Sequence, residues 1–286
     1  MKHILIPTDF SNNAKHAIIF GLAMALDLKA SVTFFHMTSF LVPTSAPLGH
    51  YEKQVAHNIE LKTAELKAHT KEFYEVLGIV EQELPTNYVV VDGLAFADQV
   101  AAYVHKNHTD LIIMGTKGET GLESIIFGSN TSNLIAKSEC AVLAIPTNYH
   151  YSKVKRIAFA TTLEHVEKDI AEFIEIVRNF KATLELVYIY PAFPPNIDIA
   201  TFDNDGFIEK LSKKFNYDKI NLHFVHTNND NEVVEGMNLF VTAYKPSLLV
   251  MNTHKRNLFD RFFNSSITEE VAMKTKLPLL ALKTIK

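Results

Sequence analysis

Cysteine and long apolar stretches are scarce in this sequence. Its 286 residues include one cysteine, Cys140, which excludes a fold stapled by internal disulfides and fits a reducing compartment. No apolar stretch approaches the ~20 residues of a membrane-spanning helix, and the apolar run near the N-terminus is too short for a signal peptide. We therefore expect a cytoplasmic protein with no membrane partner.

A surplus of positive charge is also missing. The chain has 28 lysines and arginines against 32 aspartates and glutamates, for a formal net charge of -4. Without a basic excess or a run of basic residues, neither nucleic acid nor an anionic membrane is indicated as a partner. Hydrophobic residues make up 47% and charged residues 21%, as in a typical globular protein. The length suits two domains of about 140 residues each.

What the sequence does contain is an internal repeat. Residues 4–9 and residues 157–162 are each a short apolar run that leads into a turn. Helical patterns follow both, at residues 14–28 and at residues 166–180. Similarity of this kind within one chain indicates two copies of one fold.

The spacing between matching segments changes along the chain. Residues 30–37 match residues 182–189 at an offset of 152, whereas residues 110–114 match residues 247–251 at an offset of 137. The second copy is therefore 15 residues shorter in its middle. There the first copy has a long helical pattern with polar faces, at residues 51–77.

Strands and helices alternate within each copy. The expected strands are short, β-branched and apolar on both faces, as buried parallel strands are. Helical patterns of ten or more residues separate them, which indicates βαβ crossovers. We expect an α/β fold of two doubly wound, five-stranded parallel-sheet domains. In the first copy the strands are expected at residues 4–7, 32–36, 88–91, 111–114 and 141–145.

Glycines after the fourth strand form the pattern of an anion site. Gly115 and Gly118 have no Cβ, so the backbone can approach phosphates there. Gly128 opens a helical pattern whose N–H groups and dipole favour negative charge. Turn glycines between a strand and a helix are the alternative, but ligands bind past the carboxyl ends of strands in doubly wound sheets. Nearby donors are Lys117, Ser129 and Thr131.

The spacing Gly115-x2-Gly118-x9-Gly128-Ser129 resembles the ATP-binding signature of the universal stress protein family. Residues 4–11 resemble the family's first strand and its acidic turn, and residues 34–37 resemble its second strand. Residues 140–143 resemble its fifth strand, with Ala141 where the family usually has proline. The resemblance is strong in the first half and weak in the second. It implies a tandem of domains like those of the adenine nucleotide alpha hydrolases, paired about a pseudo-two-fold axis.

The resemblance also implies roles for single residues toward ATP, ADP or AMP. Pro7, Thr8 and Asp9 would lie beside adenosine, with Asp9 bonding adenine or ribose, and the Met37 backbone would bond adenine. On the residues alone, Asp9 could equally be a turn or N-cap residue, and Met37 could be core. Met114 and Gly115 would border the ribose and phosphates. The phosphates, with Mg or Mn, would be held by Gly118, Gly128, Ser129, Asn130 and Thr131.

The second half departs from the pattern. Asp9 corresponds to Thr162, and the three glycines are replaced by residues whose Cβ atoms would lie where phosphates lie. We therefore expect an intact nucleotide domain at residues 1–147 and a degenerate one at residues 153–286. The strands at residues 141–145 and 279–282 are expected to face each other. The replacements are Asn252 for Gly115, Lys255 for Gly118 and Ser265 for Gly128, while Ser266 keeps the type of Ser129.

Other reactive residues give weaker indications of function. His105 and His108 could form a metal pair, but no third ligand has a matching spacing, so a solvated helix end is preferred. His36, on an apolar strand, is expected to be a satisfied core histidine. Cys140 is expected to be a buried, inert thiol.

We therefore expect an ATP-binding stress-response protein that acts as a nucleotide-dependent regulator. No general base is evident, so ATP hydrolysis would be slow at most, and a regulatory protein partner is implied without being identified. The alternatives are a scaffold or adaptor that binds no nucleotide, and an adenylyl-transfer or pyrophosphatase enzyme on the same fold. The sequence leaves open whether two chains associate into a homodimer.

Overall fold

The computed structural model describes residues 2–40, 48–80, 83–116, 128–147, 149–191, 199–227, 232–252 and 277–282. The chain divides into two compact units, with the boundary between Tyr151 and Ser152. In the described parts, no helix is long and apolar enough to cross a membrane.

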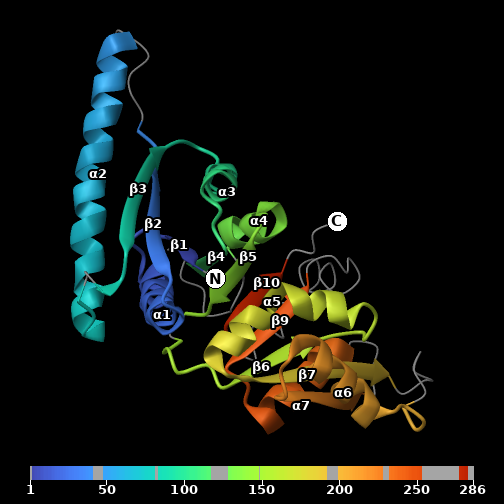
Figure 1. Ribbon diagram of the computed structural model, residues 1–286. Helices are drawn as coiled ribbons and strands as arrows, with labels where there is room; N and C mark the ends of the chain where they lie inside the picture. Colours follow the sequence, from blue (N-terminus) through green and yellow to red (C-terminus); the bar gives the residue numbers. More distant parts are fainter. Residues whose placement is uncertain are drawn as a thin grey trace. The chain divides into compact units, whose positions relative to one another are not determined.

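The first unit is a parallel sheet with helices on both faces (Figure 1). Its strand order is β3-β2-β1-β4-β5, so the chain winds outward from β1 in one direction and then returns to the other side of β1. Helices α1 and α2 pack together, as do α3 and α4. The elements are β1 (His3–Pro7), α1 (Asn12–Leu28), β2 (Ser31–Thr38), α2 (Leu48–Leu77), β3 (Thr86–Asp92), α3 (Phe96–Asn107), β4 (Leu111–Gly115), α4 (Ser129–Lys137) and β5 (Ala141–Ile145).

The second unit repeats this topology. Its strand order is β10-β9-β6-β7-β8, and the pairs between neighbouring strands are parallel. The doubly wound α/β fold expected from the sequence is therefore present in both units. The elements are β6 (Arg156–Ala160), α5 (Val166–Phe180), β7 (Thr183–Pro191), α6 (Asn204–Phe215), β8 (Ile220–Thr227), α7 (Glu232–Tyr244), β9 (Leu248–Asn252) and β10 (Leu279–Leu282).

The repeat is visible in the backbone at the helix ends. Lys29 ends α1 and Lys181 ends α5, both in the left-handed conformation with φ of 53° and 52°. His108 follows α3 with φ 50°, and Lys245 follows α7 with φ 48°. These pairs are separated by 152 and 137 positions, the two offsets found in the sequence. The shortening falls in the middle helices, where α2 has 30 residues and α6 has 12, and slightly longer elements elsewhere in the second unit reduce the net difference to 15.

Helix α1 begins earlier than the sequence pattern predicted. It begins at Asn12 and not at residue 14, because the Ser11 side chain accepts a hydrogen bond from Ala14 N and caps the helix. Helix α4 begins at Ser129, directly after Gly128, as expected from the sequence.

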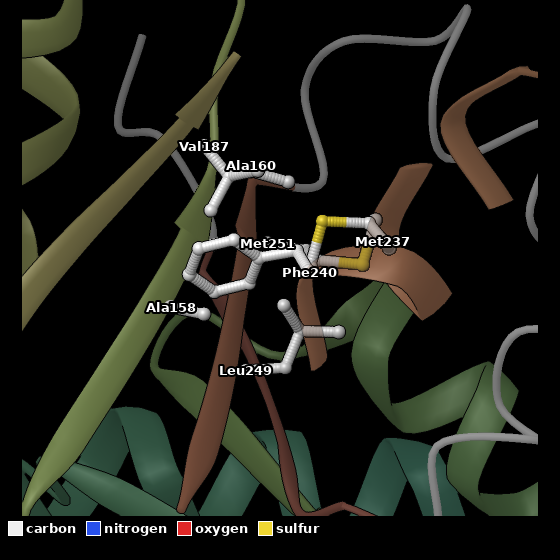
Figure 2. Packing of buried hydrophobic residues seen from close by; sticks show 7 residues of the cluster. All are labelled: Ala158, Ala160, Val187, Met237, Phe240, Leu249 and Met251. Atoms are coloured by element: carbon white, nitrogen blue, oxygen red, sulfur yellow. The ribbon is translucent and has the colours of Figure 1, made fainter. Parts of the chain in front are cut away.

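One part of the second unit's core gathers where α7 crosses the sheet (Figure 2). Two alanines on β6 leave room for the Phe240 ring, which is 1% exposed. Gly236 permits the close approach of α7, because a Cβ there would lie 2.6 Å from Cγ2 of Ile189 on β7. The buried members of this cluster are Ala158, Ala160, Val187, Met237, Phe240, Leu249 and Met251.

Candidate functional site

A tight turn joins β1 to α1 at the carboxyl end of the first sheet. Pro7 and Thr8 are buried, and the Thr8 N–H donates to the Phe35 carbonyl at 2.9 Å. The Phe10 N–H donates to Oγ1 of Thr8 at 3.1 Å, and Phe10 has a φ of 65°. Between them Asp9 is exposed, with Oδ1 accepting from the Ser11 N–H at 3.0 Å. The turn therefore holds the Asp9 carboxylate out at the edge of the sheet.

The N-terminus of α4 lies at the end of the neighbouring strand. Gly128 is the N-cap residue of α4, and no side chain caps the helix there. Ser129 and Asn130 are exposed in the first turn, whereas Thr131 is buried and its hydroxyl donates to the Gly115 carbonyl at 3.0 Å. Thr131 thus fastens α4 to β4, while the N–H groups at the helix start remain uncapped and suit an anion.

Gly115, the last residue of β4, has a neighbour that the sequence did not reveal. A Cβ at this position would lie 3.0 Å from the carbonyl oxygen of Asn13 and 3.2 Å from its carbonyl carbon. The first turn of α1 therefore passes directly over Gly115. The second unit has Asn252 in this place. Strands β1 and β6 begin 153 residues apart, so a helix that matched α1 would begin at residue 165, but α5 begins one residue later, at Val166.

Thr116 supplies a test of whether an anion suits this place. Its side chain is 2% exposed, and within the described part of the chain its Oγ1 is one of three buried side-chain atoms without a hydrogen-bond partner. The Gly128 N–H donates to the Thr116 carbonyl at 2.6 Å, so Thr116 belongs to the junction of β4 and α4. A buried hydroxyl without a partner costs about 1–3 kcal/mol. An unpaired donor beside an uncapped helix start fits a phosphate.

Sequence reasoning did not place Thr116 in the site. The only signal was its match to Thr253 in the comparison of the two copies. Lys117 and Gly118, which the sequence assigned to the phosphates, lie outside the described residues, as do Lys255, Ser265 and Ser266 of the second copy.

The end of β2 forms the remaining side of the site. His36 is 8% exposed, its Nδ1 lies 2.9 Å from the Thr8 carbonyl oxygen, and its ring packs on Phe10. This confirms the prediction of a satisfied core histidine. Met37 is half-buried, so it is not a fully buried core residue, and Met114 on β4 is buried at 7% exposure.

The second unit builds the same turn from other residues. The Thr161 N–H donates to the Val187 carbonyl at 3.0 Å, the Leu163 N–H donates to Oγ1 of Thr161 at 3.0 Å, and Leu163 has a φ of 65°. Thr162 replaces Asp9 at its centre. The fold therefore preserves the turn where the carboxylate is absent.

The other candidate residues show no chemistry of their own. Nδ1 of His105 lies 2.8 Å from Oε2 of Glu139, and both side chains are exposed, as expected of a solvated helix end. No group of three His, Cys, Asp or Glu residues that could hold a metal occurs among the described residues. Burial raises the pKa of the Cys140 thiol to about 11, so it stays protonated and weakly nucleophilic near neutral pH.

Comparisons with known proteins agree with this architecture. The model of the universal stress protein family matches residues 1–146 and residues 153–283. The whole chain is 24% identical to a universal stress protein E homolog of Haemophilus influenzae, of which 98% is covered. Half of it is 26% identical to universal stress protein MJ0531 of Methanocaldococcus jannaschii, of which 81% is covered. The crystal structure of a universal stress protein from Archaeoglobus fulgidus has the same fold, with a TM-score of 0.62 at 13% identity over 99% of this chain and 96% of that one.

Proposed function

The chain belongs to the universal stress protein family in both of its halves, and from this premise we propose that its first unit binds one adenine nucleotide. The nucleotide is ATP, ADP or AMP, and the protein acts as a nucleotide-dependent regulator in a stress response. One observation carries the proposal. The Asp9 turn follows β1, the uncapped start of α4 follows β4, and these strands are neighbours in the sheet. Doubly wound sheets bind ligands at such a point, where the winding direction reverses.

The proposed contacts divide between the two ends of the nucleotide. Pro7, Thr8, Asp9 and the Met37 backbone take adenosine. Asp9 is suited to this because its exposed carboxylate can accept hydrogen bonds from ribose or adenine. Met114 and Gly115 border the ribose and the phosphates. The phosphates are assigned to Lys117, Gly118, Gly128, Ser129, Asn130 and Thr131.

A divalent cation, Mg or Mn, is proposed to accompany the phosphates. Since no three-ligand cluster occurs among the described residues, the nucleotide would bring most of the cation's ligands itself. The hydroxyls of Ser129 and Thr131 are not bases at neutral pH, and Asp9 is assigned to the adenosine end. These assignments favour binding with at most slow hydrolysis over rapid turnover.

The second unit is proposed to bind no nucleotide. It keeps the turn after β6, but Thr162 lacks the carboxylate, and Asn252 carries a Cβ where the first unit has none at Gly115. The proposal is therefore one site per chain.

Calorimetric titration of the full chain with ATP and Mg²⁺ tests the proposal. We expect a stoichiometry of one. Asp9→Ala should weaken the affinity for ATP, and Thr162→Ala should leave it unchanged. A stoichiometry of two would contradict the assignment of the second unit. The absence of binding would contradict the function itself and favour a scaffold.

A further inference from the structure

The buried histidine His36 holds the main chain next to the proposed adenosine site. Its Nδ1 lies 2.9 Å from the carbonyl oxygen of Thr8, 28 residues earlier in the chain. A carbonyl oxygen only accepts hydrogen bonds, so Nδ1 carries the proton and donates it. A neutral imidazole is sufficient for this bond.

Thr8 is thereby anchored at three atoms. Its N–H donates to Phe35, its Oγ1 accepts from Phe10, and its carbonyl accepts from His36. Because the peptide unit is planar, fixing the Thr8 carbonyl also fixes the direction of the Asp9 N–H and the place where the Asp9 side chain leaves the backbone. The histidine thus acts on Asp9 without contacting a ligand.

A cluster of ring contacts supports the same turn. Phe10 adopts a left-handed conformation, which is uncommon for a bulky residue and persists when its surroundings determine it. Its ring centroid lies 4.5 Å from that of His36 and 5.1 Å from that of His69 on α2. Nζ of Lys62, also on α2, lies 5.9 Å from the Phe10 centroid, within the range of a cation–π contact.

The second unit shows that the turn does not require the histidine. There Tyr188 occupies the position of His36 and Leu163 that of Phe10, yet the turn keeps the N–H and hydroxyl hydrogen bonds of its threonine and the same φ of 65°. The turn therefore forms without an imidazole at this position. The histidine and the Asp9 carboxylate occur in the same unit and are both replaced in the other.

We propose that His36 is a positioning residue, which acts through the Thr8 carbonyl to aim Asp9 at the adenosine of the bound nucleotide. This role rests on the proposed function. It accounts for a buried polar side chain that the turn itself does not require.

The test compares two substitutions at one position. His36→Asn keeps an N–H donor near the place of Nδ1, whereas His36→Leu removes it. Calorimetry with Mg-ATP should show about tenfold weaker binding by His36→Leu, the effect of one lost hydrogen bond, and affinity within about twofold of the parent for His36→Asn. Tyr188→Leu, the matched change in the second unit, should leave the affinity unchanged.

Tripolyphosphate serves as the second probe, because it can occupy the phosphate end without adenosine. Its affinity should be the same in the parent and in both His36 variants, and their melting temperatures without ligand should be recorded alongside. Equal loss of ATP and tripolyphosphate binding would make the effect a general structural one and overturn the positioning role. So would ATP binding by His36→Leu at parental affinity, or failure of His36→Asn to restore it. A parent chain that binds no ATP would instead overturn the proposed function, and this role with it.

Discussion

The hydroxyl of Tyr151 donates to Oδ2 of Asp27 at 2.6 Å, which ties the segment after β5 to the C-terminal part of α1. The Tyr151 ring also packs edge-on against Phe20, with centroids 5.0 Å apart, and Thr147 donates to Oδ1 of Asn13 at 2.9 Å. The three helix residues are spaced by seven, so they form one stripe along α1. The segment that leaves β5 therefore follows α1 from its N-terminus toward its C-terminus.

Tyr151→Phe should loosen this segment. Burial, together with the hydrogen bond to Asp27, raises the pKa of Tyr151, so the hydroxyl is protonated and donates at any physiological pH. The substitution keeps the ring and removes the donor, for an expected loss of about 1 kcal/mol in unfolding free energy. Limited proteolysis should cut the segment faster than in the parent. Asp27→Asn, which keeps an acceptor oxygen, should be cut at close to the parental rate, and an unchanged rate in Tyr151→Phe would refute the anchor.

Gly115→Ala should destabilise the ligand-free protein. The new Cβ would lie 3.0 Å from a backbone oxygen of Asn13, which cannot move without displacing the start of α1, so we expect a loss of about 1–3 kcal/mol. Urea denaturation without nucleotide measures it. Gly93→Ala is the control, since the atom nearest to its Cβ is the flexible side-chain end of Gln99 at 3.2 Å. Equal stability of the two variants would contradict the close approach of α1 to β4.

Gly128→Val should abolish nucleotide binding with little change in stability. The valine side chain would lie at the N-cap of α4, in front of the N–H groups assigned to the phosphates. Asp9→Ala should weaken binding by about 1.5–3 kcal/mol, through loss of hydrogen bonds to a charged acceptor. Titration with Mg-ATP measures both effects. Parental affinity in Gly128→Val would put the phosphates elsewhere.

Glu185 on β7 should make the stability of the second unit depend on pH. Its side chain is 3% exposed, and Oε2 accepts from Nε2 of His223 at 2.8 Å and from Nδ2 of Asn221 at 3.0 Å. Burial alone would raise the pKa of this carboxyl, but these hydrogen bonds and the Arg156 charge outweigh burial and lower it. A carboxyl with a lowered pKa stabilises the fold above its unfolded pKa of about 4.3 and loses that contribution as pH falls through its folded pKa.

Glu185→Gln should therefore unfold more easily than the parent at pH 7, by about 1–3 kcal/mol. The difference should shrink as the pH falls below about 4, where the parental carboxyl takes up its proton. Chemical denaturation at several pH values measures this. Glu175→Gln, at an exposed glutamate paired with Arg178, should show little change at any pH. A difference that is constant from pH 7 to pH 3 would exclude a charged Glu185.

Several parts of the site were predictable because their signals are local in sequence. Gly128 before a polar helical start predicts an anion-binding N-terminus, and residues 4–9 predict a strand that ends in an acidic turn. The role of Thr131 could not be predicted. Its hydroxyl bonds a carbonyl 16 residues away, and nothing in the sequence indicates which strand end α4 starts against. The same holds for Asn13 over Gly115, since α1 and β4 are about 100 residues apart along the chain.

By itself, the sequence determined the repeat, the alternation of strands and helices, the shortened middle of the second copy and the different residues that the two halves have at matching site positions. Each of these depends on residue periodicity or on residue identity at matching offsets, which the chain carries without folding. Only the tertiary structure decided that His36 bonds the Thr8 carbonyl, that the Phe10 ring contacts two histidine rings and that Gly115 lies under α1. Those contacts join segments that become neighbours only when β1 is placed between β2 and β4, and the order of strands in a sheet is set by packing of the whole unit.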